Sequence, residues 1–219
     1  RNEHLFSLSQ ALELYDIYQK KILACDIQLE KQLSLFTTKQ PERGNNPTKP
    51  KPKHKQKSKN EPQFDLTSYL LKMVGVDLTA IPGIGAASAL KIISEVGLDM
   101  SRWGNSKQFA SWLGVCPGNK VSGGKKLSSK TKRTSNYAAS TFRMAASTLH
   151  HNNSALGAFF RRLKSRLGAP KATTAAAHKL AIIVYEMIKN KTEYRETGQD
   201  YYEKHYRERL VKQLSSRAK

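Results

Sequence analysis

Aspartate and glutamate are absent from residues 100–185 of this chain, whereas the same stretch carries fifteen lysines and arginines. Charges of one sign repel one another, so a folded segment without counter-charges of its own is costly in isolation. A polyanion relieves that repulsion, and nucleic acid phosphate is the most plausible one. The whole chain of 219 residues has a formal net charge of +21, spread over several segments, which favours the same partner.

Cysteine is also scarce, since Cys25 and Cys116 are the two in the chain. They lack the paired spacing of a zinc site and the density of a secreted disulfide scaffold, so we expect reduced thiols and no metal site. The chain has no run of eighteen apolar residues and no signal peptide, which predicts a soluble, intracellular protein with no membrane partner. It begins at Arg1 rather than at Met, so we expect it to be part of a longer protein.

The N-terminal segment has apolar residues at the alternating three- and four-residue spacing of a heptad seam. These residues are Leu5, Leu8, Leu12, Tyr15, Ile22, Leu29, Leu33 and Phe36. Gln19 and Asp26 interrupt the seam, and polar residues at such positions often specify register and oligomeric state. The pattern predicts a coiled-coil helix over residues 1–36 that forms a homo-oligomer, a dimer or a tetramer. The alternative is a helix that packs on another domain of its own protein.

Residues 37–63 change character, because prolines alternate there with lysines and no apolar core is possible. We expect a disordered or extended basic linker that either lies along phosphates or serves as a solvated spacer. It separates the N-terminal helix from a compact domain over residues 64–190, which is followed by a charged C-terminal helix over residues 191–219.

The compact domain is predicted to be mainly α, because its apolar residues recur at helical spacing. Helices are expected at residues 86–96, from a cap at Thr134 or Ser135 to Leu149, over Leu156–Leu163, over Lys171–Lys189 through the centre, and over Tyr201–Leu214. Arg161 and Arg162 are assigned mostly to a solvated helix face.

The segment Ile81–Gly85 fits the hairpin of a helix-hairpin-helix unit. Gly83 and Gly85 allow backbone conformations that other residues avoid, and they bring amides to the surface next to a helix N-terminus. Such a loop holds a phosphate without reading base sequence. The alternative is a tight turn between packed helices with no ligand.

A second loop places one hydroxyl among cations. Its residues are Lys120, Ser122, Gly123, Gly124, Lys125, Lys126, Lys130, Lys132 and Arg133. The loop suits either a phosphate cradle or a serine nucleophile, since attack on a phosphodiester needs charge neutralisation and close backbone approach. A base is missing, because no carboxylate lies anywhere in the surrounding stretch.

Several blocks in this order resemble the C-terminal transposase domain of the IS-one-ten family of insertion-sequence transposases. The blocks are Ile81–Gly85, Phe109–Pro117, Ser122–Lys125, Met144–Ala146, His151–Asn152, Ala158–Leu163, His178–Leu180 and Tyr201–Leu210. The resemblance covers roughly residues 64–216, and its blocks are specific in combination but weak singly.

That resemblance implies a recombinase guided by a structured bridge RNA, which joins donor and target DNA. It implies an acidic RuvC-like domain that binds magnesium and is absent from this chain, a coiled coil that assembles protomers, and a serine that links covalently to DNA. The matching serine is Ser122, with Ser128 and Ser129 as its nearest competitors. The chain alone is expected to bind nucleic acid without recombining it, at the nucleoid of a bacterium or archaeon.

Two other functions fit the residues. A non-enzymatic helix-hairpin-helix module would bind nucleic acid structure with no role for the Ser122 hydroxyl. A basic RNA-binding assembly factor would prefer a folded RNA and form no adduct with DNA. Loss of strand exchange on replacing Ser122 separates the recombinase from both.

Overall fold

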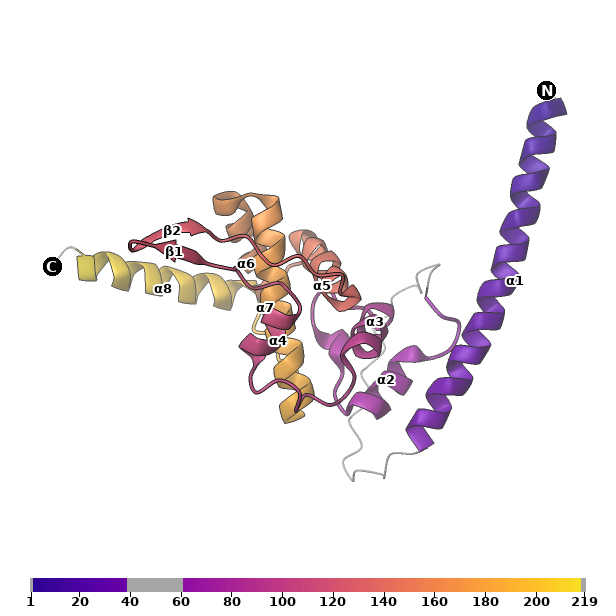
Figure 1. Cartoon of the computed structure of the whole chain (residues 1–219), viewed down its shortest axis with the longest axis horizontal. Coiled ribbons are helices and arrows are strands. Elements are labelled where there is room, and N and C mark those ends of the chain that lie inside the picture. The colour runs from indigo at the N-terminus through magenta and orange to yellow at the C-terminus, as the bar shows by residue number, and fades with distance from the viewer. Residues whose placement is uncertain (1, 39–60, 218–219) are drawn as a thin grey trace. The chain divides into compact units, whose positions relative to one another are not determined.

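A computed structural model describes residues 2–38 and 61–217 of the chain and is mainly helical, as predicted (Figure 1). The α-helices are α1 (Asn2–Thr38), α2 (Leu66–Val74), α3 (Ala86–Val96), α4 (Ser106–Trp112), α5 (Tyr137–Thr148), α6 (Ala155–Leu167), α7 (Ala169–Asn190) and α8 (Gln199–Arg217). Two short 3-10 helices, η1 (Leu78–Ala80) and η2 (Leu149–His151), and two strands, β1 (Lys120–Ser122) and β2 (Lys125–Ser128), complete the described elements.

The chain divides into two compact units, residues 1–73 and residues 74–219. Most of the predicted basic linker, residues 39–60, lies outside the described residues. The N-terminal helix predicted over residues 1–36 is present as α1, which continues two residues beyond the predicted end at Phe36, and its pairing as a coiled coil stays a prediction.

In the first unit, residues farther along the same chain form hydrogen bonds with the C-terminal half of α1. The backbone N–H of Gln63 donates to Asp26 at 3.2 Å, and the Tyr69 hydroxyl donates to Glu30 at 3.3 Å. Asp26, which interrupts the apolar seam, therefore accepts a hydrogen bond from the same polypeptide. The N-terminal half of the seam, including Leu5 and Leu12, is exposed.

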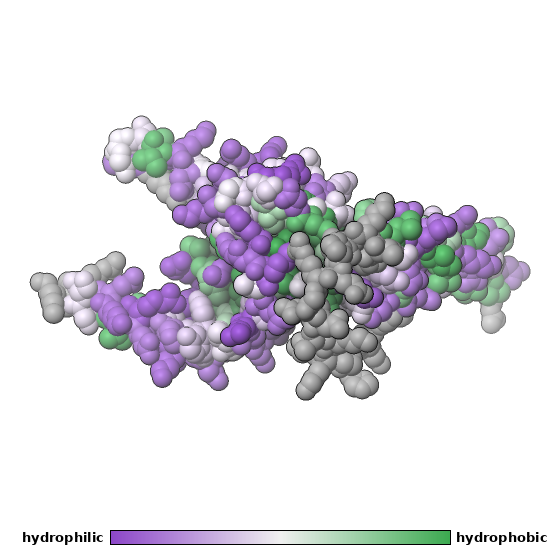
Figure 2. Space-filling model, turned by 90° about the horizontal axis from the view of Figure 1, so that it is seen from below, coloured by the Kyte–Doolittle hydropathy of each residue, from purple (hydrophilic) through white to green (hydrophobic). Residues whose placement is uncertain are grey.

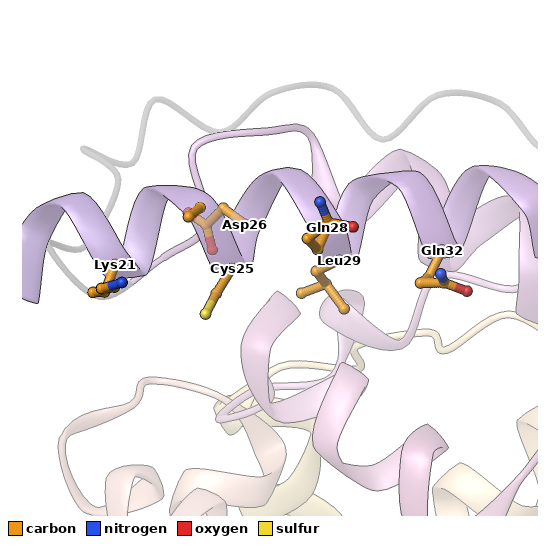
Figure 3. Close-up of a pocket in the computed structure, with 7 residues that line it drawn as sticks. Lys21, Cys25, Asp26, Gln28, Leu29 and Gln32 are labelled. Carbon is orange, nitrogen blue, oxygen red and sulfur yellow. The ribbon is translucent and has the colours of Figure 1, made fainter.

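The C-terminal half of α1 also has a shallow hollow on its surface. Figure 3 shows Cys25 and Leu29 on the same side of the helix, where a shallow hollow is lined by residues of α1 alone. Cys25 is a free, exposed cysteine. The hollow contains no pair of groups suited to catalysis, and no ligand is assigned to it.

Helix α7 forms the centre of the second unit, as its apolar sequence predicted. Small residues such as Ala176, Ala177 and Ala181 are almost fully buried, and they let α4, α5 and α6 pack closely around it. The hydroxyl of the buried Tyr185 donates to the carbonyl of Trp103 at 2.7 Å. This bond ties α7 to the loop before α4 and satisfies two buried polar groups.

Aromatic rings fill the end of this core next to α4. Trp103 lies 5.0 Å from Phe109 and 5.1 Å from Trp112, and Phe109 lies 5.6 Å from Tyr185, between ring centroids. Trp103 is buried, whereas Trp112 is partly exposed to solvent.

The assignment of Arg161 and Arg162 to a solvated face is wrong, because both side chains are half-buried against the C-terminal segment. Arg161 donates to the carbonyls of His150 and Asn152 and to Gln199. Arg162 donates to the Tyr202 hydroxyl at 3.0 Å and lies over the ring of Tyr206. The two guanidinium groups hold α8 on α6, since planar donors with an apolar face suit both hydrogen bonding and stacking.

Candidate nucleic-acid interface

Ser122 lies at the tip of an antiparallel β-hairpin, a local structure that the sequence analysis did not predict. Ser122 pairs with Lys125 across a two-residue turn, and Val121 pairs with Lys126. Gly123 and Gly124 both have positive φ, 54° and 73°, as a tight hairpin turn requires. Glycine is the residue that adopts this conformation without strain, so the glycine pair fixes the register and the position of Ser122.

The hairpin stands on a stalk that is anchored to the domain core. Pro117 forms a bridge with Thr131, and the Gly118 amide donates to the Lys130 carbonyl at 3.0 Å. Below it, the Thr134 hydroxyl donates to the Leu113 carbonyl at 3.2 Å. The tip is thus held away from the core by backbone pairing, and Figures 1 and 2 show the hairpin and α8 extending from the second unit as separate arms.

The Ser122 side chain is exposed and makes no hydrogen bond within the described residues. Ser128, a competitor for its role, is half-buried and accepts a hydrogen bond from the Lys130 amide at 3.3 Å. Ser129 is exposed. Of the three serines, Ser122 is the one at the turn, where a phosphate has free access from solvent.

Exposed cations surround the hairpin along its length. Lys120, Lys125, Lys130, Lys132 and Arg133 all have exposed side chains, whereas the Lys126 side chain lies outside the described residues. Two apolar side chains are exposed among them, Val121 at 63% and Leu127 at 69%. An arm with this composition fits a partner that offers both phosphates and apolar surface, as the grooves and bases of nucleic acid do.

The loop with Gly83 and Gly85 feeds directly into α3, whose bounds agree with the prediction. Gly83 has φ of 88°, and a Cβ atom there would lie 2.6 Å from the carbonyl oxygen of Ala145 on α5. Close packing on α5 therefore demands a glycine at this position. Gly85 is exposed and precedes the first turn of α3 with no side-chain cap, so amides of that turn face outward.

Before this loop the chain forms the 3-10 turn η1 and the helix α2. The Asp77 side chain caps η1 by accepting from the Thr79 amide at 2.8 Å. The assignment of these residues to a helix-hairpin-helix unit stays a prediction. The assignment of phosphate binding to Gly83 and Gly85 stays a prediction.

The two predicted phosphate-binding elements adjoin opposite ends of α5. Its N-terminus follows the hairpin stalk and is capped by Asn136, which accepts from the Ala139 amide at 3.1 Å. Its C-terminus meets Gly83 through Ala145 and Thr148. Sequence reasoning did not place the two elements on one helix, because the stalk and the loop lie about fifty residues apart in the chain.

Two histidines and a cysteine of this unit have pKa values that their surroundings shift. The positive charge of Lys164, together with burial, lowers the pKa of His150, which favours its neutral form. His150 and His151 lie 3.3 Å apart, Nδ1 to Nε2. Burial lowers the pKa of His178 and raises that of Cys116, so Cys116 stays a thiol. Within the described part of the chain, the Ser122 hydroxyl has no hydrogen bond to any of these groups.

Together, the fold and the interface define a basic, mainly helical domain that presents a cationic hairpin and a glycine loop on one scaffold. No helix in the described part of the chain is long and apolar enough to cross a membrane. Residues 77–161 match a family model described as the transposase IS116/IS110/IS902 family. The matched segment contains the glycine loop, the hairpin and α5, and it supports a transposase of this kind. The comparison with curated proteins gave no match.

Proposed function

We propose that the chain is the nucleic-acid-binding and nucleophile-bearing part of a DNA transposase, with Ser122 as the residue that attacks a DNA phosphodiester. The observation that carries the proposal is the family match, whose segment includes Ser122 at an exposed hairpin tip among cations. The absence of Asp and Glu from residues 100–185, which include the hairpin, supports a surface that lies against phosphates.

The proposed step is a phosphoryl transfer that conserves the phosphodiester bond. The Ser122 oxygen forms a bond to phosphorus, and the bond from phosphorus to one flanking sugar oxygen breaks. The hydroxyl proton passes to a base, and the leaving oxygen takes up a proton. Lys125, paired with Ser122 across the turn, neutralises charge that develops on the phosphate oxygens, and Lys120, Lys130 and Arg133 position the strand.

The base comes from outside the hairpin, because the stretch around Ser122 has no carboxylate. The resemblance to the family implies an acidic RuvC-like domain as its source, on the same protomer or on a second one. Magnesium would belong to that domain. The described residues of this chain bring no group of three or more His, Cys, Asp or Glu side chains together, and none of them is assigned to the metal.

Two features of the whole recombinase are part of the same proposal. The exposed N-terminal half of the α1 seam pairs with a second copy of the chain, because apolar residues at heptad spacing are left uncovered there. The basic surface beyond the hairpin receives a structured bridge RNA that selects donor and target DNA. Such a recombinase acts at the nucleoid.

A covalent adduct tests the nucleophile directly. We expect a recombinase that joins this chain to the acidic domain to form a protein-DNA adduct on a nicked or bulged duplex, and mass spectrometry of the digested adduct to place the link on Ser122. The chain of residues 1–219 alone serves as the control and is expected to bind without linking. Attachment at Ser128, Ser129 or a residue outside the hairpin would remove Ser122 from the mechanism.

A non-enzymatic nucleic-acid-binding module remains the second candidate function. It is favoured by the isolation of Ser122, whose hydroxyl has no hydrogen-bond partner in the described residues. Under this alternative the complete recombinase carries out strand exchange, and no DNA adduct forms on the hairpin.

A further inference from the structure

The outer face of α5 is exposed and carries no charge, although it lies within the most basic part of the chain. Tyr137, Ser140, Met144 and Ser147 recur at helical spacing, and all four are exposed. Tyr137 is 75% exposed and Met144 is 65% exposed. The opposite face, with Ala138 and Phe142, is buried in the core.

This face connects the two candidate phosphate-binding elements. Tyr137 is the first residue of α5 and lies four residues beyond Arg133 on the hairpin stalk. Thr148, at the other end, lies against the loop of Gly83. A helix of 12 residues spans about 18 Å, which corresponds to about five steps along one strand of a duplex. A strand of this length can lie along α5 and touch both elements.

The residues on the face suit bases better than phosphates. Phosphates require cations or amides, and the one cation of α5, Arg143, is half-buried and donates to the Gly114 carbonyl at 3.1 Å. Lys132 and Arg133, just before the helix, supply two exposed cations. An exposed aromatic ring beside such cations is the arrangement that stacks on bases in proteins that bind single strands. Within the described residues the Tyr137 side chain has no hydrogen bond and no contact with another aromatic ring.

We propose that the outer face of α5 is a strand-binding surface on which Tyr137 stacks on an unpaired nucleobase of a strand held by Lys132 and Arg133. The base is unpaired because the faces of paired bases are covered by their neighbours in a duplex. The inference rests on the proposed function for its partner, and it adds the place where an opened strand is held during recombination.

The test uses the chain of residues 1–219 and a short duplex in which one unpaired base is a fluorescent adenine analogue. Binding is expected to quench the fluorescence, because the analogue stacks on the Tyr137 ring. Tyr137→Ala is expected to abolish the quenching and to weaken binding about fivefold to a hundredfold. Tyr137→Phe is expected to keep the quenching and the affinity of the parent chain. The salt dependence of binding is unchanged in each variant, since no cation is removed.

Tyr201→Ala is the matched control, because Tyr201 is an exposed tyrosine outside the acid-free stretch. It is expected to leave quenching and affinity as they are in the parent chain. Equal quenching by the parent and Tyr137→Ala, with salt-dependent binding intact, would overturn the stacking site and leave the proposed function standing. Failure of the parent chain to bind any of these duplexes would overturn both, and loss of self-association in Tyr137→Ala would reassign the face to a protein interface.

Discussion

Replacing Ser122 by alanine in the complete recombinase is expected to lower strand exchange by about a thousandfold or more. The reason is that the covalent route needs the hydroxyl oxygen, and no neighbouring group can take its place at the hairpin turn. DNA affinity should stay within about twofold, because the side chain is exposed, makes no hydrogen bond in the described residues and leaves the glycine turn unaltered.

The measurement is strand exchange between labelled donor and target DNA, with binding followed on the same samples. Ser129→Ala is the matched control, since Ser129 is an exposed serine on the same stalk. It is expected to retain exchange. Full exchange by Ser122→Ala would show that Ser122 is not the nucleophile. Loss of both binding and exchange would indicate that the substitution damages the interface and not only the chemistry.

Removing four hairpin charges is expected to have the second-largest effect. Lys120, Lys125, Lys130 and Lys132 are exposed on one arm, and each is changed to glutamine. Each phosphate contact contributes about 0.9 to the slope of log affinity against log salt, so loss of four contacts lowers the slope by roughly three to four. Affinity for DNA then falls by about a thousandfold at 0.1 M salt.

A second quadruple variant separates contact from net charge. Lys20, Lys21, Lys31 and Lys72 are exposed lysines outside the acid-free stretch, and their change to glutamine removes the same formal charge. Direct contact at the hairpin predicts a small loss of affinity and a nearly unchanged slope for this control. Equal losses of affinity in the two variants would mean that DNA binding depends only on the overall charge of the chain.

The helices were predictable from the sequence because local signals and tertiary packing agree. Gly85 and Gly97 flank an apolar periodic run, and α3 occupies the residues between them. Helix α6 ends at Leu167, four residues beyond the predicted Leu163, and α7 begins at Ala169, two residues before the expected Lys171. Proline is tolerated in the first turn of a helix, where its missing amide costs no hydrogen bond, so Pro170 lies inside α7.

The hairpin was not predicted, because a strand of three or four residues carries too short an alternation to distinguish it from a charged loop. The Gly123–Gly124 pair between Lys-Val-Ser and Lys-Lys-Leu-Ser was the available signal for a tight two-residue turn. Its exposure on a stalk depends on bridges between residues 117 and 131, which no local pattern reveals.

Candidate site residues were chosen from charge and glycine content, and their positions relative to one another required the fold. Arg161 and Arg162 have the composition of a solvated face but hold α8, since the residues that bind them lie about forty positions later in the chain. Sequence reasoning did not single out Tyr137 as a site residue. Its position after Lys132 and Arg133 was visible, but exposure of its ring depends on which side of α5 faces the core.

The salt dependence of DNA binding by residues 1–219 tests most directly whether the acid-free half of the chain lies on nucleic acid phosphates. Affinity for a short duplex is measured from about 50 to 200 mM salt, where six to ten phosphate contacts would cost roughly three to five decades. We expect a straight line of steep negative slope in log affinity against log salt. Weak binding that does not change with salt over this range would contradict the account.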